Sequence, residues 1–273
     1  MSAVLPQPSA RWQPSLLLRA SLALHIAAAL LTLLRPHVWP WTLGAVIADQ
    51  LLLMALGLWP RSGALGSNWT RLPQAAVARG EVAITIDDGP DPQVTPQVLA
   101  ILAAHQVHVT FFCIGERAAR HADCVRACAA AGHAIENHSY HHRLYFSLLG
   151  PRAIRGEIER AQQVLTPLGS SVPRFFRAPA GLRNLLLDRA LQRAGLQLAS
   201  WTRRGFDTVS SDPASVLTRL TRHLAAGDIL LLHDGNAARD GAGTPLLLDV
   251  LPPLLEAIAA RALRPVTLRE ALR

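Results

Sequence analysis

The chain has 273 residues, which is long enough for one large domain and an appendage. Half of the residues are hydrophobic, and the net charge of +8 comes from scattered arginines without a basic run, which argues against nucleic acid as a partner. The three cysteines, Cys113, Cys124 and Cys128, are an odd set that does not predict a disulfide framework. Free thiols favour a cytoplasmic location.

Two apolar segments open the chain, at residues 16–34 and 41–59, and each has 19 residues. This is close to the roughly 20 residues that a helix needs to cross a bilayer. We therefore predict that residues 1–60 form a membrane hairpin, with membrane lipid as a partner. A cleavable signal peptide fits poorly because a second apolar segment follows the first. The alternative is a helical hairpin buried in a soluble fold.

Aromatic residues flank these segments, as in the interfacial belts of membrane proteins. They are Trp39, Trp41, Trp59 and Trp69.

Polar residues lie near the centre of both apolar segments. His25 lies in the first, and Asp49 and Gln50 lie in the second. In an antiparallel hairpin these positions have similar depth, and an isolated charge there is costly. We therefore expect a pair between His25 and Asp49, the alternative being that Asp49 faces another partner or water.

Both ends of a two-span hairpin lie on the same side of the membrane. Arg11, Arg61 and Arg71 fall on that side, and Arg35 falls on the other. The excess of positive charge favours a cytoplasmic C-terminal domain, with a periplasmic or extracellular one as the alternative. Residues 61–79 are interpreted as a linker.

From residue 80 to 273, strand-like and helix-like segments alternate. The predicted strands are 81–86, 107–114, 133–136, 174–176, 196–201, 228–232 and 265–267. The predicted helices are 94–104, 116–131, 152–166, 183–194, 213–226 and 246–261. This alternation predicts an α/β fold with a parallel sheet, either closed as a barrel or open.

The first predicted strand ends in "TIDDGP". Asp87 and Asp88 therefore follow a buried apolar run, and two adjacent carboxylates repel each other unless positive charge lies nearby. The alternative is a simple turn, because Asp, Gly and Pro are all turn residues.

The third predicted strand leads into "HSYHH". His138 and His142 are four residues apart, which places both imidazoles on one side of a helical turn. With Asp87 or Asp88 they form a candidate His₂-Asp metal site, whose three ligands leave a position open for water. A surface turn is the alternative.

Charged residues also follow later strands: Arg177, Asp207, His233 and Asp234. An arginine at the end of an apolar strand needs a carboxylate partner, unless its side chain reaches the surface. Because parallel strands end at one face of the sheet, we expect these side chains to lie close together there.

Five segments, "TIDDGP", "HSYHH", "RAPAG", "WTRRGFD" and "LLLHD", resemble in order and spacing the motifs of the polysaccharide deacetylase family. These are metal-dependent carbohydrate N-deacetylases, including the nodulation type, and the likeness covers about residues 80–273. It implies a distorted (β/α) barrel with fewer than eight repeats, preceded here by the two-helix transmembrane hairpin. It also implies one divalent metal, with zinc favoured over cobalt, nickel or manganese.

The resemblance also assigns roles to the catalytic residues. Asp88, His138 and His142 resemble the family's metal ligands. Asp87 resembles the catalytic base, and Arg177 resembles the residue that pairs with that base and orients it. On this interpretation the adjacent aspartates differ in role, since the metal neutralises one and Arg177 the other.

Further residues resemble the family's acid and its substrate wall. His233 resembles the catalytic acid, and Asp207 the carboxylate that tunes it. Trp201 and Leu231 resemble the apolar wall around the acetyl methyl group. The family commonly has an aromatic residue where this chain has Ala180, whose backbone N–H remains available to the substrate.

Taken together, the sequence predicts a membrane-anchored, metal-dependent hydrolase of carbon–nitrogen amide bonds. Its expected substrate is an N-acylated, most simply N-acetylated, amino sugar on a lipid or in a cell-envelope polysaccharide. The alternatives are an inactive membrane-tethered carbohydrate-binding protein and a membrane scaffold with a passive domain. Nothing in the sequence identifies protein partners.

Overall fold

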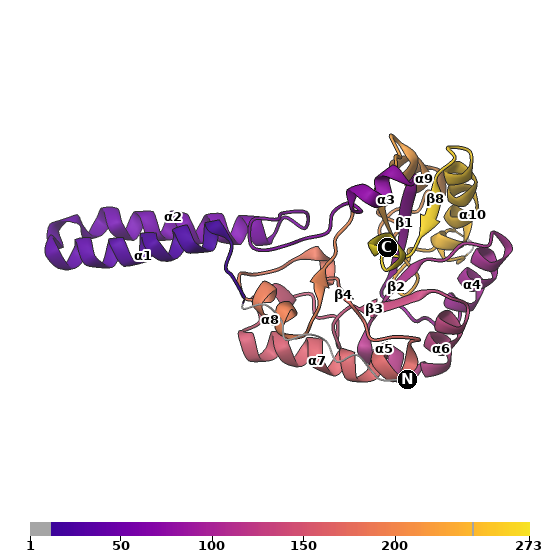
Figure 1. Cartoon of the computed structure of the whole chain (residues 1–273), viewed down its shortest axis with the longest axis horizontal. Helices are drawn as coiled ribbons and strands as arrows, with labels where there is room; N and C mark the ends of the chain where they lie inside the picture. The colour runs from indigo at the N-terminus through magenta and orange to yellow at the C-terminus, as the bar shows by residue number, and fades with distance from the viewer. Residues whose placement is uncertain (1–11, 242) are drawn as a thin grey trace.

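A computed structural model describes residues 12–241 and 243–273 of the chain. Figure 1 shows two long helices projecting side by side from an α/β domain. Arg11, which the sequence places among the charges flanking the hairpin, lies outside the described residues.

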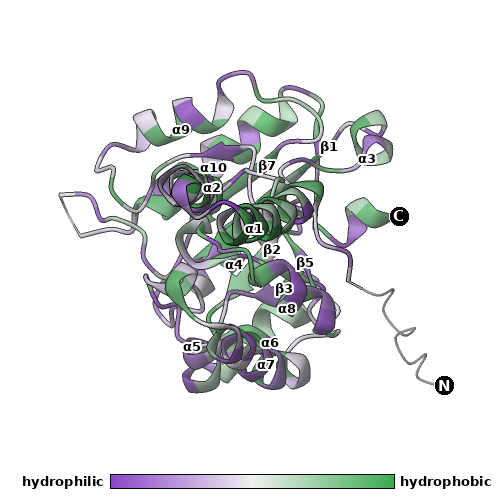
Figure 2. Cartoon of the chain, turned by 90° about the vertical axis from the view of Figure 1, so that its left-hand side faces the viewer, coloured by the Kyte–Doolittle hydropathy of each residue, from purple (hydrophilic) through white to green (hydrophobic). Residues whose placement is uncertain are grey.

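The projecting helices are α1 (Leu16–Leu34) and α2 (Trp39–Gly57), joined by the 3₁₀ turn η1 (Pro36–Val38). Both are long and apolar enough to cross a membrane by length and composition. Only 6% and 11% of their apolar windows are buried, so these helices do not belong to the core of the described domain. Viewed along the pair, α1 is hydrophobic on nearly all sides (Figure 2).

The polar residues inside the hairpin form one connected layer. The Ser21 hydroxyl donates to Asp49 across the helix pair at 2.6 Å. His25 approaches Asp49 only to 3.8 Å, and its Nδ1 lies 2.8 Å from the Ser21 carbonyl oxygen. Its Nε2 lies 3.2 Å from the Gln50 amide. The expected contact between His25 and Asp49 is thus bridged by Ser21.

The domain contains a single parallel sheet, so the predicted α/β class is confirmed. Its strands run in the order β5-β4-β3-β2-β1-β7-β6, and β8 pairs with the start of β1. The sheet curls into an open half-barrel with fewer than eight repeats, as the motifs imply. The strands are β1 (Glu81–Asp87), β2 (Thr110–Cys113), β3 (Ala134–Asn137), β4 (Phe175–Phe176), β5 (Gln197–Leu198), β6 (Arg203–Arg204), β7 (Ile229–His233) and β8 (Arg264–Val266).

Most predicted helices are present, but the expected helix at 116–131 is two helices. The chain leaves helical geometry at His121, with φ −127° and ψ 50°, and no glycine or proline marks the break in the sequence. The domain helices are α3 (Gln74–Ala78), α4 (Thr95–Ala104), α5 (Gly115–Arg120), α6 (Ala122–Ala130), α7 (Pro151–Leu168), α8 (Leu187–Arg193), α9 (Pro213–Thr221) and α10 (Leu246–Ala259).

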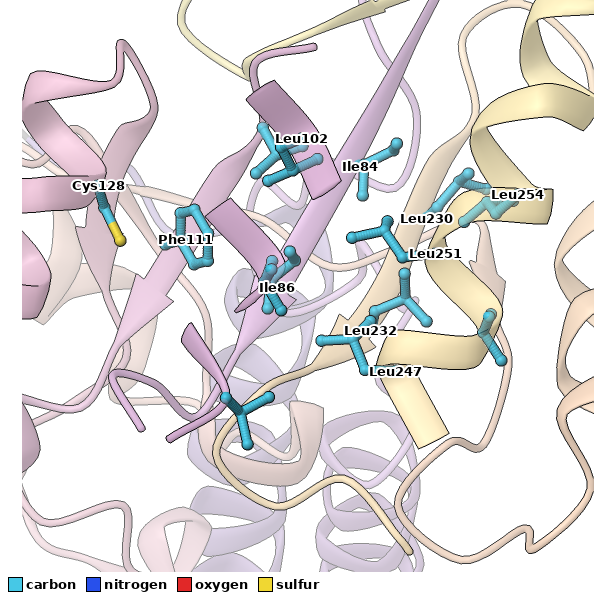
Figure 3. Close-up of a cluster of buried hydrophobic side chains, with 14 of the residues drawn as sticks. Ile84, Ile86, Leu102, Phe111, Cys128, Leu230, Leu232, Leu247, Leu251 and Leu254 are labelled. Carbon is cyan, nitrogen blue, oxygen red and sulfur yellow. The ribbon is translucent and has the colours of Figure 1, made fainter. Parts of the chain in front are cut away.

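Strand alternation separates the core of the domain from its site. On β1, Ile84 and Ile86 face the covering helices, and on β7 Leu230 and Leu232 do the same. Figure 3 shows these side chains packed against α10, where Leu251 lies among them. Residues at the odd positions of the same strands therefore point into the half-barrel.

The inward face of the half-barrel is apolar near the amino ends of β1 and β7 and polar at their carboxyl ends. Ala83 on β1 and Ile229 on β7 belong to a second buried cluster inside the sheet. Two residues further along each strand stand Thr85 and Leu231, and then Asp87 and His233, which are register partners. Asp87 and His233 therefore face the same space at the carboxyl ends of adjacent strands.

The segment predicted as a linker, residues 61–79, packs on the domain. Leu65 and Leu72 are buried, and Trp69 forms a parallel bridge with Ala199. The Trp69 ring also meets Phe175 edge-on at 5.1 Å. The assignment of Trp69 to a membrane-interface belt is therefore wrong, because its ring lies within the domain. The domain boundaries themselves stay a prediction.

Candidate active site

A pocket of about 200 Å³ lies at the carboxyl ends of the strands. Eight of the ten residues predicted for the site line it directly, and Arg177 and Asp207 lie behind its wall. The eight are Asp87, Asp88, His138, His142, Ala180, Trp201, Leu231 and His233.

Asp87 and Arg177 form a buried ion pair. Arg177 Nη1 donates to Asp87 Oδ1 at 2.6 Å and to the Thr85 hydroxyl at 2.7 Å. Its remaining nitrogens donate to the carbonyl oxygens of Ala199 and Ser200. A guanidinium with all of its nitrogens engaged is fixed in place, so it holds one oxygen of Asp87 and leaves the other facing the pocket.

The second aspartate belongs to a different cluster. Asp88 Oδ1 lies 3.2 Å from Nε2 of both His138 and His142, and the candidate ligand atoms of all three lie within 4.8 Å of one another. His138 Nδ1 lies 2.8 Å from the Arg177 carbonyl oxygen, which can only accept. The proton is therefore on Nδ1, and the Nε2 lone pair points at the cluster.

These residues fit a divalent cation. Asp88 Oδ1 is buried and accepts no hydrogen bond from the described residues, although a buried carboxylate oxygen needs a partner. Burial alone would raise the pKa of Asp88, but His138 and His142 lower it below its ordinary range. Burial, with His138, lowers the pKa of His142 to about 4, so both the anionic oxygen and a neutral imidazole are available at pH 7. Two nitrogens and one oxygen form a donor set typical of catalytic zinc sites.

His233 faces this cluster from the neighbouring strand. Its Nδ1 lies 2.9 Å from Asp207 Oδ1, and its backbone N–H donates to Asp207 Oδ2 at 2.7 Å. Burial would lower the pKa of His233, but the Asp207 carboxylate outweighs it and raises that pKa above its ordinary value. This shift favours the protonated imidazole, whose Nε2 is directed at the pocket.

The remaining wall is apolar and tightly built. Trp201 is nearly buried, and Leu231 lies beside it on β7. Ala180 has a φ of 53°, the left-handed region, and is followed by Gly181 at 74°. A Cβ on Gly181 would lie 2.5 Å from the Trp201 ring and 2.7 Å from Pro60. This turn therefore has no room for a side chain at residue 181.

Two polar residues near the candidate cation site of Asp88, His138 and His142 were not found from the sequence. The Asn236 amide donates to Asp88 Oδ2 at 2.8 Å, and Arg117 Nη2 donates to the Asn236 side-chain oxygen at 3.0 Å. Arg117 also donates to the Asp88 carbonyl oxygen at 2.8 Å. Together they fix the orientation of Asp88 from the side away from the histidines.

The turn that carries the histidines is held by a buried glutamate. Glu157 on α7 accepts from the backbone N–H groups of Tyr140 and His141 and lies 2.6 Å from His141 Nδ1. His141 thus faces Glu157 and not the metal cluster. No short motif marks Asn236, Arg117 or Glu157, so their roles depend on tertiary contacts.

Comparison with known proteins decides the family. The sequence profile described as polysaccharide deacetylase matches residues 74–199. A peptidoglycan-N-acetylglucosamine deacetylase of Bacillus cereus is 34% identical over 70% of this chain and 88% of its own length. A chitooligosaccharide deacetylase of Azorhizobium caulinodans is also 34% identical, over 58% of this chain and 75% of its own. The chain belongs to the polysaccharide deacetylase family.

Solved structures of polysaccharide deacetylases share the fold. A peptidoglycan N-acetylglucosamine deacetylase matches with a TM-score of 0.66 and 26% identity, over 75% of this chain and 92% of its own. A family 4 carbohydrate esterase from Streptomyces lividans, in complex with acetate, matches with a TM-score of 0.62 and 29% identity, over 68% and 91%. The predicted resemblance and the predicted enzyme class, a hydrolase of non-peptide amide bonds, are both confirmed.

Proposed function

We propose that this polysaccharide deacetylase is a membrane-anchored, metal-dependent enzyme that removes the acetyl group from an N-acetylated amino sugar. One observation carries the proposal. The Asp–His–His cluster, the Asp87–Arg177 pair and the His233–Asp207 pair surround a single pocket. A passive scaffold or a carbohydrate-binding domain has no need of three such arrangements in one place.

Asp88, His138 and His142 would hold the cation, and zinc suits their donor set best, with cobalt, nickel or manganese as alternatives. A cation bound there supplies Lewis acidity that polarises the amide carbonyl. Asp87 is the general base that takes a proton from the attacking water, and Arg177 fixes the orientation of its carboxylate.

The second half of the reaction needs an acid. When the carbon–nitrogen bond breaks, the departing amine takes a proton from His233 Nε2, while Asp207 stabilises the imidazolium. Water supplies the hydroxyl that remains on acetate, so the products are acetate and the free amino sugar. Trp201 and Leu231 enclose the methyl group, and the Ala180 backbone N–H lies beside the carbonyl oxygen in this assignment.

The anchor is the pair of helices α1 and α2. Their exposed surfaces carry large apolar residues along both helices, among them Leu22, Leu30, Ile47 and Leu51. Such surfaces are stable in lipid and unfavourable in water. The sequence charges favour a cytoplasmic domain, with Arg61 and Arg71 on the domain side and Arg35 at the distal turn.

The experiment is an assay of the full chain in detergent micelles with zinc bound. We expect acetate release from chitotetraose. The Asp87→Asn variant should retain zinc and lose about a thousandfold in kcat/KM, because it removes only the base. The Asp249→Asn variant is the matched control, since Asp249 is exposed on α10.

Two results would contradict the proposal. Zinc bound without acetate release from any N-acetylated sugar favours the carbohydrate-binding alternative. Full activity in Asp87→Asn would remove this residue from the role of base.

A further inference from the structure

Arg204 is a cation inside the pocket without a counterion. It lines the pocket from β6, and in the described part of the chain its side chain forms no ion pair or hydrogen bond. Its guanidinium stacks over the rings of Trp201 and Phe206, with its central carbon 5.5 and 5.0 Å from their centroids. The aromatic rings hold the guanidinium in place but leave its donors free.

The neighbouring residue, Arg203, faces the opposite side of the sheet and is paired with a carboxylate. Arg203 pairs with the Asp228 carboxylate and donates to the carbonyl oxygens of Arg222 and His223. In register, Arg203 lies opposite Leu230, which faces the helices, and Arg204 lies opposite Leu231, which faces the pocket. Strand alternation therefore sends the unpaired arginine into the site and the paired one out of it.

The other charges of the site are already balanced. Asp87 has Arg177, Asp207 has His233, and Asp88 faces the cation site with its two histidines. The Arg204 guanidinium has no such partner, so an anionic group of a ligand would interact with it favourably. Its planar N–H donors suit phosphate oxygens. A neutral sugar polymer offers no such group.

A second observation concerns the position of the pocket. The end of α2 is bound to the loops that form the pocket wall. The Gly57 carbonyl accepts from the Arg183 backbone N–H at 3.0 Å, and the Pro60 carbonyl accepts from the Ser200 hydroxyl at 2.7 Å. Pro60 also contacts Gly181, which lines the pocket. If α1 and α2 span a bilayer, the pocket lies next to its surface.

Exposed apolar side chains occur at this end of the domain. Leu144 lines the pocket and is 76% exposed. Leu58 and Trp59, which follow α2, and Val209, which follows the pocket residue Thr208, are also exposed. Apolar residues continuous with a membrane hairpin are suited to contact with lipid.

We propose that the substrate is a glycolipid in which the N-acetylated amino sugar is joined to its lipid through a phosphate, and that Arg204 receives this phosphate. The inference rests on the proposed function and specifies its substrate class. The lipid remains in the bilayer beside Leu58 and Trp59, and the sugar reaches the cation cluster.

The test uses the full chain in vesicles of phosphatidylethanolamine and phosphatidylglycerol, with four probes that separate the two features. The dodecyl phosphate ester of N-acetylglucosamine carries lipid and phosphate, and dodecyl N-acetylglucosaminide carries lipid alone. N-acetylglucosamine 1-phosphate carries phosphate alone, and the methyl glycoside carries neither. We expect kcat/KM for the first probe to exceed that of each other probe by about tenfold or more.

Variants connect this preference to Arg204. Arg204→Ala should lower the ratio of kcat/KM between the phosphate ester and the dodecyl glycoside to near one, mainly through KM. Arg204→Lys should restore part of the ratio, because the charge returns without the planar donors. Arg155→Ala removes a similar charge from the exposed face of α7 and should leave the ratio unchanged. Thermal unfolding checks that each variant is folded.

The outcomes separate this inference from the proposed function. Acetate release from chitotetraose together with a ratio near one in the wild type overturns the inference and leaves the function standing. A wild-type preference that survives Arg204→Ala also overturns it. Equal rates on the phosphate ester and on N-acetylglucosamine 1-phosphate overturn the lipid part. No acetate from any probe or from chitotetraose overturns the function and the inference together.

Discussion

The hairpin and the domain both contain polar side chains in apolar surroundings, but these side chains are partnered differently. In the hairpin, Ser21, His25, Asp49 and Gln50 bond to one another, and no buried side-chain atom among them lacks a partner. In the candidate active-site pocket, Asp88 Oδ1 and Arg204 Nε are buried and have no hydrogen-bond partner among the described residues.

This difference separates a structural contact from a binding site. A satisfied polar layer in an apolar pair of helices fixes register and needs nothing from outside. An unsatisfied atom in a pocket costs free energy until a partner is supplied, so it is a candidate contact for a ligand. The predictions below test this contrast, from the largest expected effect to the smallest.

The largest effect is expected when a leucine is replaced by alanine in the core of the domain, and the same substitution in the hairpin should have little effect. Leu251 on α10 is fully buried in the core of Figure 3, whereas Leu30 on α1 is 55% exposed. Leu251→Ala should lower the free energy of unfolding of the domain by about 2–5 kcal/mol. Leu30→Ala should change it by less than about 0.5 kcal/mol. Thermal unfolding in detergent measures both, and equal costs would show that α1 packs against the domain.

The next largest effect concerns the candidate cation site of Asp88, His138 and His142. Asn236→Ala removes the donor to Asp88 Oδ2 without touching a predicted ligand. Zinc affinity should fall by about 10–100-fold, as for other residues that orient a metal ligand. Competition with a chelator measures it. Gln93→Ala, on an exposed residue, is the control, and unchanged affinity in Asn236→Ala would mean that Asp88 is oriented by its backbone alone.

A pH profile tests the His233–Asp207 pair. Because Asp207 raises the pKa of His233, the protonated acid predominates below that pKa, and kcat should fall as pH rises through it. Asp207→Asn removes the charge, so the alkaline limb should move to lower pH. A limb that stays in place would show that another group supplies the proton.

The smallest effect is expected in the hairpin. Asp49→Leu removes an acidic side chain from the middle of α2, so membrane insertion should stay intact or improve. The helix pair should loosen by only about 0.6 kcal/mol, because one hydrogen bond from Ser21 is lost. Distance distributions between spin labels on the two helices measure this, and an unchanged width would mean that packing alone holds the pair.

Much of the fold and the site follows from the sequence because strands and motifs are local. The runs before Asp87 and before His233 are apolar and end in charged residues, and parallel strands bring such ends together. The five motifs then place every predicted site residue in or behind one pocket.

What the sequence could not predict depends on contacts between distant segments. The break at His121 has no glycine or proline signal, and Trp69 resembles a belt residue until Phe175 is seen beside it. Asn236 and Glu157 are ordinary polar residues in the sequence, and only the folded chain brings them to Asp88 and to His141.

The close joint at Gly57 has a consequence for how the enzyme meets its substrate. A Cβ at this position would lie 2.3 Å from the Arg183 carbonyl oxygen, so helix α2 meets the domain backbone directly. The pocket therefore has a fixed height above the end of the hairpin and cannot reach out as a tethered domain on a slack linker would. If the hairpin spans a bilayer, as proposed, the enzyme searches a plane instead of a volume, and the sugars within its reach are those held at that height.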